Sequence, residues 1–308
     1  MKCLLIGGAG FIGSWLTKYL TDIGYKVIII DPLIQYENDN PNSQKIREFR
    51  NKKLLKKAVI YKGRFEDIGK KIIKKEKPQI VVHLAAYPLE YSFDSPFSLK
   101  QLTEDITLTY QIVSLLKEYP IKKFIFLSSI SAYGNFDYTI TETAPLHPTT
   151  VYGVSKASGE FLVKSHLDNW IILRMTNVYG FGDLHSRSTN TIINKAIKGE
   201  KFWINDSAWL DFIYIKDLVE GILQVISKSA VKEIYHISGG KAYKLSSFVK
   251  HLPDFFKLKY NKRYLHDRPI RGTMDNSKAR MVLGWTPKMN LEKGIKDYLK
   301  YIKKYNFA

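Results

Sequence analysis

The chain contains one cysteine in 308 residues, so no disulfide can form within it. This residue, Cys3, lies in a short apolar run, where we expect a buried small side chain rather than a reactive thiol. Such low cysteine content is typical of proteins in a reducing compartment. We therefore expect a cytoplasmic protein whose stability comes from a hydrophobic core.

Long hydrophobic runs are also missing. No stretch reaches the roughly 18 apolar residues that span a bilayer. The apolar run at the N-terminus meets glycines after Ile6, so it is too short for the core of a signal peptide. We expect neither a membrane-spanning segment nor export.

Acidic residues are few relative to basic ones: the chain has 29 Asp and Glu, 48 Lys and Arg, and a formal net charge of +19. Such a charge can indicate nucleic-acid binding. Here, however, the lysines form dispersed doublets, and neither zinc-finger spacing nor an RNA-binding aromatic motif accompanies them. We expect no nucleic-acid partner, and a substrate that is anionic and carries phosphate.

Metal-ligand spacing is absent from the histidines and carboxylates, so we expect no metal site. His83 ends an apolar run. We interpret it as a buried histidine that forms a structural hydrogen bond.

The first half of the chain alternates short β-branched or aromatic runs with amphipathic segments. Near-continuous apolar runs of this length are typical of strands buried on both faces of a parallel sheet. Strands are predicted at 2–6, 26–30, 58–61, 80–84, 124–128 and 170–173, and helices at 11–23, 65–75 and 99–119. This alternation predicts an α/β fold, a Rossmann-type doubly wound parallel sheet.

Beyond about residue 177, glycines and prolines interrupt the alternation. This part predicts a smaller mixed α/β C-terminal domain over the carboxyl ends of the sheet strands, where open α/β sheets bind ligands. We expect a cofactor-binding Rossmann domain at 1–176 with about 205–235, and a substrate-binding domain at about 177–204 with 236–308. A further strand is predicted at 211–215 and a surface helix at 291–305.

Gly7, Gly10 and Gly13 form a G-x-x-G-x-x-G pattern between the first predicted strand and the first predicted helix. The pattern alone is a weak signal, because glycines also make ordinary turns. Its place at the start of a βαβ unit is where a pyrophosphate needs a tight turn and a close backbone. It therefore predicts a dinucleotide site.

Asp31 ends the second predicted strand, about eighteen residues after this turn. A carboxylate there accepts hydrogen bonds from the adenosine ribose and repels a 2′-phosphate. No arginine follows directly, so NAD is favoured over NADP. The alternative is a plain turn residue before Pro32.

Three further residues suggest chemistry on a hydroxyl group. Ser129 ends the fifth predicted strand, and Tyr152 and Lys156 are four residues apart in a predicted helix, hence on one face. A free tyrosine has a pKa near 10. The charges of the lysine and of a nicotinamide favour the phenolate, which makes Tyr152 a usable proton acceptor.

Together these motifs resemble the extended short-chain dehydrogenase/reductase family, in its nucleotide-sugar epimerase and dehydratase branch that includes UDP-glucose 4-epimerases. The similarity runs nearly end to end. It is carried by GGAGFIG from Gly7, HLAA from His83, YGVSK from Tyr152, LRMTNVYG from Leu173, LDFIYIKDL from Leu210 and DNSKARMVLGW from Asp275.

The resemblance implies bound NAD, a nucleoside-diphosphate sugar as substrate, and catalytic roles for Ser129, Tyr152 and Lys156. Tyr152 and Lys156 would also contact the cofactor. The other implied cofactor contacts are Gly7, Gly10, Phe11, Ile12, Gly13, Asp31, Leu84, Ala85 and Ala86. The implied substrate contacts are Ser131, Asn177 and, for a phosphate, Arg268. Relatives often form homodimers, through helices that correspond to 99–119 and 152–166.

Where this chain differs from the motifs of the branch, some of the activities of the branch become less consistent with the sequence. Its 4,6-dehydratases carry Thr-Asp-Glu where this chain has Ser129-Ile130-Ser131, so elimination of water would lack its proton carriers. We therefore expect no dehydratase.

Other departures from the family affect residues that would bind the adenine of the cofactor and the diphosphate of the substrate. Arg64 replaces an aspartate near the adenine, with Asp67 as the candidate substitute. Asp105 replaces an asparagine, and Leu210 replaces an arginine that often binds the diphosphate. For this reason the sequence does not identify the nucleotide base of the substrate.

The leading hypothesis is an NAD-dependent oxidoreductase acting at C4 of a nucleotide hexose, as a 4-epimerase. A 4-dehydrogenase or a 4-keto-sugar reductase is the open alternative. A non-catalytic NAD-binding regulator is a further one, against which the presence of Tyr152 and Lys156 argues.

Overall fold

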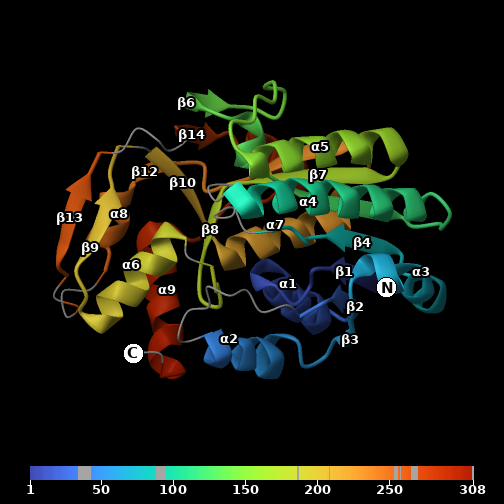
Figure 1. The fold of residues 1–308 in the computed structure, drawn as a ribbon, viewed down its shortest axis with the longest axis horizontal. Helices are drawn as coiled ribbons and strands as arrows, with labels where there is room; N and C mark the ends of the chain where they lie inside the picture. The colour runs from blue at the N-terminus through green and yellow to red at the C-terminus, as the bar shows by residue number, and fades with distance from the viewer. Residues whose placement is uncertain are drawn as a thin grey trace.

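The computed structural model describes residues 1–33, 43–87, 95–185, 187–207, 209–252, 256, 258–264 and 270–306. Within these residues, the centre of the fold is a seven-stranded parallel sheet of order β11-β7-β5-β4-β1-β2-β3 (Figure 1). Its strands are β1 (Lys2–Ile6), β2 (Lys26–Asp31), β3 (Val59–Lys62), β4 (Ile80–His83), β5 (Lys123–Ser129), β7 (Trp170–Met175) and β11 (Glu233–Ile237). The strand order reverses between β1 and β4, where open parallel sheets form their ligand crevice. The predicted Rossmann arrangement is confirmed.

Helices cover both faces of this sheet, because successive side chains of its strands alternate between two hydrophobic cores. Leu5 and Ile29 belong to one core, and Leu4 and Ile28 to the other. The first core is completed by α1 (Phe11–Asp22) and α7 (Ile215–Lys228), and the second by α3 (Phe65–Glu76), α4 (Ser95–Leu116) and α5 (Val151–His166). Because helices cover both faces of the sheet, a ligand can reach it only at the ends of its strands.

The strand predicted at 58–61 forms as β3, but its predicted burial on both faces is wrong. Val59 and Ile60 are 38% and 37% exposed. The reason is position: β3 is the edge strand and pairs with β2 on one side. Apolar composition does not distinguish an edge strand from a central one.

Smaller sheets contain most of the strands after β7. The strand predicted at 211–215 forms as β10 (Trp209–Tyr214), in a sheet of order β12-β10-β8 rather than in the large sheet. The other small-sheet elements are β6 (Phe136–Ile140) with β14 (Arg271–Met274), β9 (Phe202–Asn205) with β13 (Tyr260–Arg263), and the partners β8 (Asn177–Tyr179) and β12 (Ala242–Lys244). Helices α6 (Ser188–Lys198) and α8 (Leu245–Lys250) lie beside β9, and α9 (Leu291–Lys304) contacts β10 (Figure 1).

A basic helix follows the polar segment after β2. It comprises α2 (Ser43–Phe49) and a π-helical turn (Arg50–Leu54). Phe49 packs its ring edge-on against Phe181, at 4.8 Å between centroids, which ties this helix to the segment after β8. Arg50, the first residue of the π-helical turn, is thereby held beside the start of α1, where it donates to the carbonyl of Ala9.

No helix in the described ranges is both long and apolar enough to cross a membrane. Cys3 is buried in the core, as predicted, and burial raises the pKa of its thiol.

Candidate active site

A cavity of about 1360 Å³ opens at the carboxyl ends of the sheet strands. Ile6, Asp31, Ser129 and Met175, the last residues of β1, β2, β5 and β7, line it. All the predicted site residues that the structure describes line it as well: Gly7, Gly10, Phe11, Ile12, Gly13, Asp31, Leu84, Ala85, Ala86, Ser129, Ser131, Tyr152, Lys156 and Asn177. Arg268, predicted to contact a phosphate, lies outside the described residues.

The glycine turn has the geometry that a pyrophosphate requires. Gly7 has a φ of +79°, and a Cβ there would lie 2.7 Å from the backbone N of Ala85. At Gly13 a Cβ would lie 2.7 Å from Cα of Gly8, so any side chain would push α1 off the turn. Gly10 caps α1 without a side chain over its first amides. The amino end of α1 can therefore receive an anion, and the turn fits a dinucleotide.

Asp31 forms the turn contact considered from the sequence, and it also lines the cavity beside the glycine turn. Its Oδ1 accepts the N–H of Leu33 at 2.8 Å, as a turn residue would. Its Oδ2 accepts the N–H of Ala9 at 3.0 Å, which fixes the carboxylate beside the glycine turn. Burial raises the pKa of Asp31, while these hydrogen bonds and the charge of Arg50 oppose the rise.

Arg50 is a cavity residue that sequence reasoning missed, because it does not directly follow Asp31. It donates to the carbonyls of Ala9 (3.3 Å) and Gly182. Its position depends on how α2 packs, for which the sequence carries no motif.

Replacing Asp31 with Asn is expected to weaken NAD binding by about 10- to 100-fold, since hydrogen bonds to a charged group contribute about 1.5–3 kcal/mol. NADP should lose less, because the carboxylate repels its 2′-phosphate. Calorimetric titration of cofactor-free protein with both dinucleotides measures the two losses. Equal weakening of both would indicate damage to the turn rather than a ribose contact.

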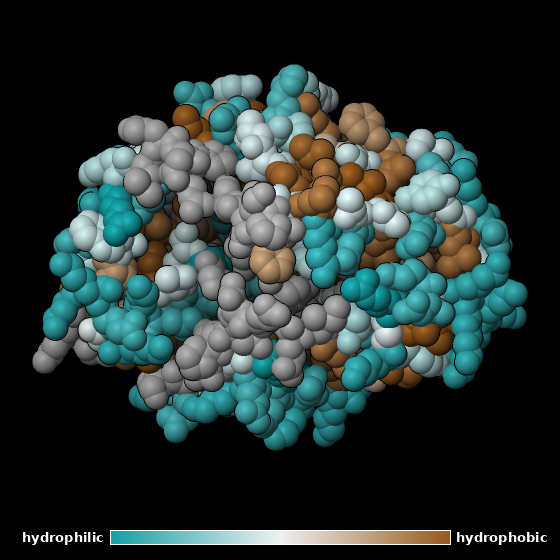
Figure 2. Space-filling model, in the orientation of Figure 1, coloured by the Kyte–Doolittle hydropathy of each residue, from teal (hydrophilic) through white to brown (hydrophobic). Residues whose placement is uncertain are grey.

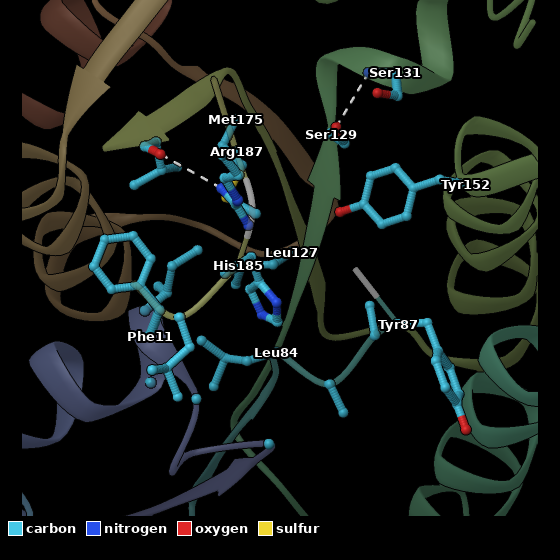
Figure 3. A pocket seen from close by; sticks show the side chains of 18 of the residues that line it. Phe11, Leu84, Tyr87, Leu127, Ser129, Ser131, Tyr152, Met175, His185 and Arg187 are labelled. Atoms are coloured by element: carbon cyan, nitrogen blue, oxygen red, sulfur yellow. Dashed lines mark hydrogen bonds between the residues drawn. The ribbon is translucent and has the colours of Figure 1, made fainter. Parts of the chain in front are cut away.

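The catalytic candidates converge at the end of β5. In Figure 3 the ring of Tyr152 extends from α5 toward Ser129. Ser129 Oγ accepts the N–H of Ser131 at 3.1 Å, which orients its hydroxyl. Thr150 caps α5 by accepting the N–H of Gly153 at 3.1 Å and so fixes the turn that carries Tyr152.

Lys156 lies buried behind Tyr152. Its Nζ donates to the carbonyl of Leu127 at 3.0 Å and lies 5.6 Å from the centre of the Tyr152 ring. Burial lowers the pKa of Lys156, while the negative charges of Asp105 and Glu160 oppose the decrease. The ammonium is therefore positioned to favour the Tyr152 phenolate.

His83 is a structural residue, as predicted. Its Nε2 lies 3.1 Å from Oγ1 of Thr109, which itself donates to the carbonyl of Asp105 at 2.8 Å. The Thr109 hydroxyl must then accept from His83, which places the imidazole hydrogen on Nε2. Burial lowers the pKa of His83 to about 3, so the ring is neutral.

Basic residues from the second half of the chain also line the cavity, and sequence reasoning missed them. His185 and Arg187 lie across the cavity from Tyr152 (Figure 3). Arg187 pairs with Asp183 at 3.4 Å, and the guanidinium carbon of Arg263 lies 4.2 Å from the centre of the Trp203 ring. Leu210 lines the same cavity without a charge, so these arginines supply positive charge that Leu210 cannot.

The cavity is cationic overall. Of the described lining residues, eight are Lys or Arg and four are Asp or Glu. Arg64 and Glu66 belong to this lining, whereas Asp67 is exposed outside it. A surplus of positive charge favours ligands that carry phosphates.

Comparison with known sequences gives relatives of two activities. A putative UDP-glucose 4-epimerase of Methanocaldococcus jannaschii is 29% identical, over 98% of this chain and 99% of that protein. dTDP-D-glucose 4,6-dehydratase of Dictyostelium discoideum is 31% identical over 259 residues, 77% of this chain but only 58% of that protein. Human dTDP-D-glucose 4,6-dehydratase is 28% identical, over 97% of this chain and 89% of that protein.

Comparison with solved structures gives epimerases among the similar folds. UDP-glucose 4-epimerase of Thermotoga maritima, crystallised with UDP-glucose, is 27% identical with a TM-score of 0.83. UDP-glucuronic acid 4-epimerase of Bacillus cereus, crystallised with UDP-glucuronic acid and NAD, is 25% identical with a TM-score of 0.86. Each alignment covers 99% of both chains.

Residues 3–238 match the NAD dependent epimerase/dehydratase family, and this match includes the glycine turn, Ser129, Tyr152 and Lys156. The chain belongs to this family of NAD-dependent enzymes.

Proposed function

We propose that this chain is a nucleotide-sugar 4-epimerase. The observation that carries the proposal is the direction of the Tyr152 side chain, which extends toward Ser129 in the cavity (Figure 3) with the Lys156 ammonium behind its ring. A hydroxyl of the sugar placed between Tyr152 and Ser129 would hydrogen-bond to both. Tyr152 then takes the hydroxyl proton and later returns it.

The residues of the glycine turn and Asp31 would hold NAD, which supplies the chemistry of taking a hydride from C4 and returning it. Ser129 would share the hydrogen bond at the reacting oxygen and keep it in line with Tyr152. Asn177 and the cavity arginines would hold the diphosphate. The sugar can then turn over while its nucleotide stays bound.

The residues beside Ser129 favour an epimerase over a dehydratase. Ile130 and Ser131 are buried and carry no carboxyl group. Within the described residues, the carboxylates that line the cavity are Asp31, Glu66, Glu104 and Asp105. Asp31 and Asp105 are both held by backbone N–H groups. The acid and base that water elimination requires have no counterpart at 130 and 131.

NMR of the purified protein with UDP-, GDP- and dTDP-hexoses tests the proposal. We expect inversion at C4 without added oxidant and no methyl signal at C6, which elimination of water would create. Net reduction of added NAD would instead indicate a dehydrogenase, and net oxidation of added NADH would indicate a 4-keto-sugar reductase. No turnover of any sugar by NAD-loaded protein would contradict the epimerase, dehydrogenase and reductase hypotheses alike and would favour a non-catalytic regulator.

We also propose a homodimer formed through α4 and α5, which lie side by side (Figure 1). Apolar side chains gather over these helices in Figure 2. Leu99 is 66% exposed and Phe161 is 64% exposed. A second copy would cover them, and light scattering at micromolar concentration distinguishes dimer from monomer.

A further inference from the structure

Asp105 is a buried carboxylate on α4 beside the catalytic lysine. Its Oδ1 accepts the N–H of Tyr87 at 2.9 Å, and its Oδ2 accepts the hydroxyl of Ser155 at 3.2 Å. Ser155 precedes Lys156 on α5, and both Asp105 and Lys156 line the cavity. Among the described residues Asp105 forms no ion pair within 4.0 Å, so its charge is not neutralised by direct contact.

The other charged groups near Lys156 are already neutralised or neutral. Glu160 on α5 forms two hydrogen bonds to Arg174, at 2.9 and 2.8 Å. His83, at the end of β4, is neutral. Asp105 is therefore the described carboxylate near Lys156 that has no cation bound to it.

Of the charged groups that face Asp105 itself, Glu104 is already paired and Lys156 is the cation that acts on it. On its own helix, Glu104 pairs with Arg64 (3.4 Å) and accepts the hydroxyl of Tyr87 (2.8 Å). The charge of Lys156 acts on Asp105, and that of Asp105 acts on Lys156. Burial raises the pKa of Asp105 to about 6, so above that pH its charge is present.

We propose that Asp105 is a positioning residue that offsets part of the Lys156 charge and thereby sets the pH at which Tyr152 becomes a base. Ser155 and the Tyr87 amide hold the carboxylate in place for this role. The inference rests on the proposed role of Tyr152. It concerns the residues of this chain and does not depend on which sugar is bound.

The direction follows from electrostatics. An ionised Asp105 weakens the field that Lys156 exerts on the Tyr152 hydroxyl, so the phenolate forms at a higher pH than with the lysine alone. Asp105→Asn removes the charge and keeps the shape of the side chain. The acidic limb of kcat/KM is therefore expected to shift to lower pH, by roughly one unit.

Two readouts test this proposal. The first is the pH profile of kcat/KM for wild type and Asp105→Asn with a turned-over sugar. The second needs no substrate: phenolate absorbance between pH 5 and 9 in NAD-loaded and cofactor-free protein. Subtracting the spectrum of Tyr152→Phe in each background isolates Tyr152 from the other tyrosines. We expect the Tyr152 phenolate to form at lower pH in Asp105→Asn.

Matched variants separate charge from hydrogen bonding. Ser155→Ala removes a hydrogen bond to Asp105 but leaves the charge of the carboxylate, which the Tyr87 amide still holds, and should shift both readouts much less than Asp105→Asn. Glu118→Gln makes the same acid-to-amide change at an exposed site just after α4, paired with Lys70 at 3.5 Å, and should shift neither. Thermal unfolding shows whether each variant folds.

Two results would overturn the proposal. In the first, the Tyr152 phenolate forms at the same pH in folded Asp105→Asn as in wild type. The other is a shift in Ser155→Ala equal to that in Asp105→Asn. If no sugar is turned over but the phenolate titration still shifts, the proposed function fails and the role of Asp105 stands.

Discussion

Tyr152→Phe is expected to lower kcat by about 10²- to 10⁴-fold, the usual contribution of a positioned general base. The substitution removes one oxygen and keeps the ring, whose centre lies 5.6 Å from Lys156 Nζ. Affinity for NAD and for the nucleotide should change little, because Phe keeps the Tyr152 ring and most of those contacts are assigned to other residues. Steady-state kinetics with calorimetry of both ligands separates the two effects.

Tyr138→Phe provides the matched control for this experiment. Tyr138 lies on β6 and is 63% exposed, so loss of its hydroxyl should leave kcat unchanged. Equal kcat values for Tyr152→Phe and wild type would place the base elsewhere. A loss of nucleotide affinity alone would make Tyr152 a binding residue rather than a base.

The second large effect is on stability. Glu160→Gln is expected to lower the free energy of unfolding by about 3–5 kcal/mol, the cost of leaving a buried partner charge unpaired. Glu160 is fully buried, and Arg174 is 3% exposed. Gln keeps the size of the side chain, but its amide cannot balance the guanidinium charge. Denaturant unfolding followed by fluorescence and circular dichroism measures the loss.

The network around Glu160 explains why the pair matters. Glu160 also accepts the hydroxyl of Ser128 at 2.5 Å, so it joins α5 to β5 and, through Arg174, to β7. Arg174 stacks over the Tyr133 ring, 4.7 Å from its centre, and Tyr133 lies 2.6 Å from Nε2 of His236. The helix that carries Tyr152 is thus anchored to the strand that carries Ser129.

Glu292→Gln is the control for this measurement, because it makes the same change in an exposed pair with Lys296 on α9. Solvent screens such pairs, so little loss is expected. If both variants unfold at the same denaturant concentration, the buried network contributes no more than an exposed pair.

Much of the fold could be predicted from local patterns. The runs at 2–6, 26–30 and 124–128 become strands within a residue of their predicted bounds, and α1 begins at Phe11 as predicted. The glycine turn was identifiable because Gly7 and Gly13 meet steric requirements that act within one βαβ unit. Tyr152 and Lys156 share a helix face for the same local reason.

Features that depend on distant segments could not be predicted in this way. The seventh strand of the large sheet, β11, comes after the small-sheet strands β8, β9 and β10 in the chain, and β10 belongs to a small sheet instead. Arg50 reaches the glycine turn only because Phe49 packs against Phe181. The sequence marked Asp105 as a departure and gave no reason for it, since its charge matters only where α4 packs against α5.

The sequence by itself determined the class of fold, the cofactor turn and the Ser-Tyr-Lys set, because each depends on residue spacing within a strand, a turn or a helix. The tertiary structure alone decided which charges surround that set: Asp105 beside Lys156, Glu160 bound to Arg174, and the arginines that line the cavity. Electrostatic effects depend on distance and burial in space, and neither can be read from separation along the chain.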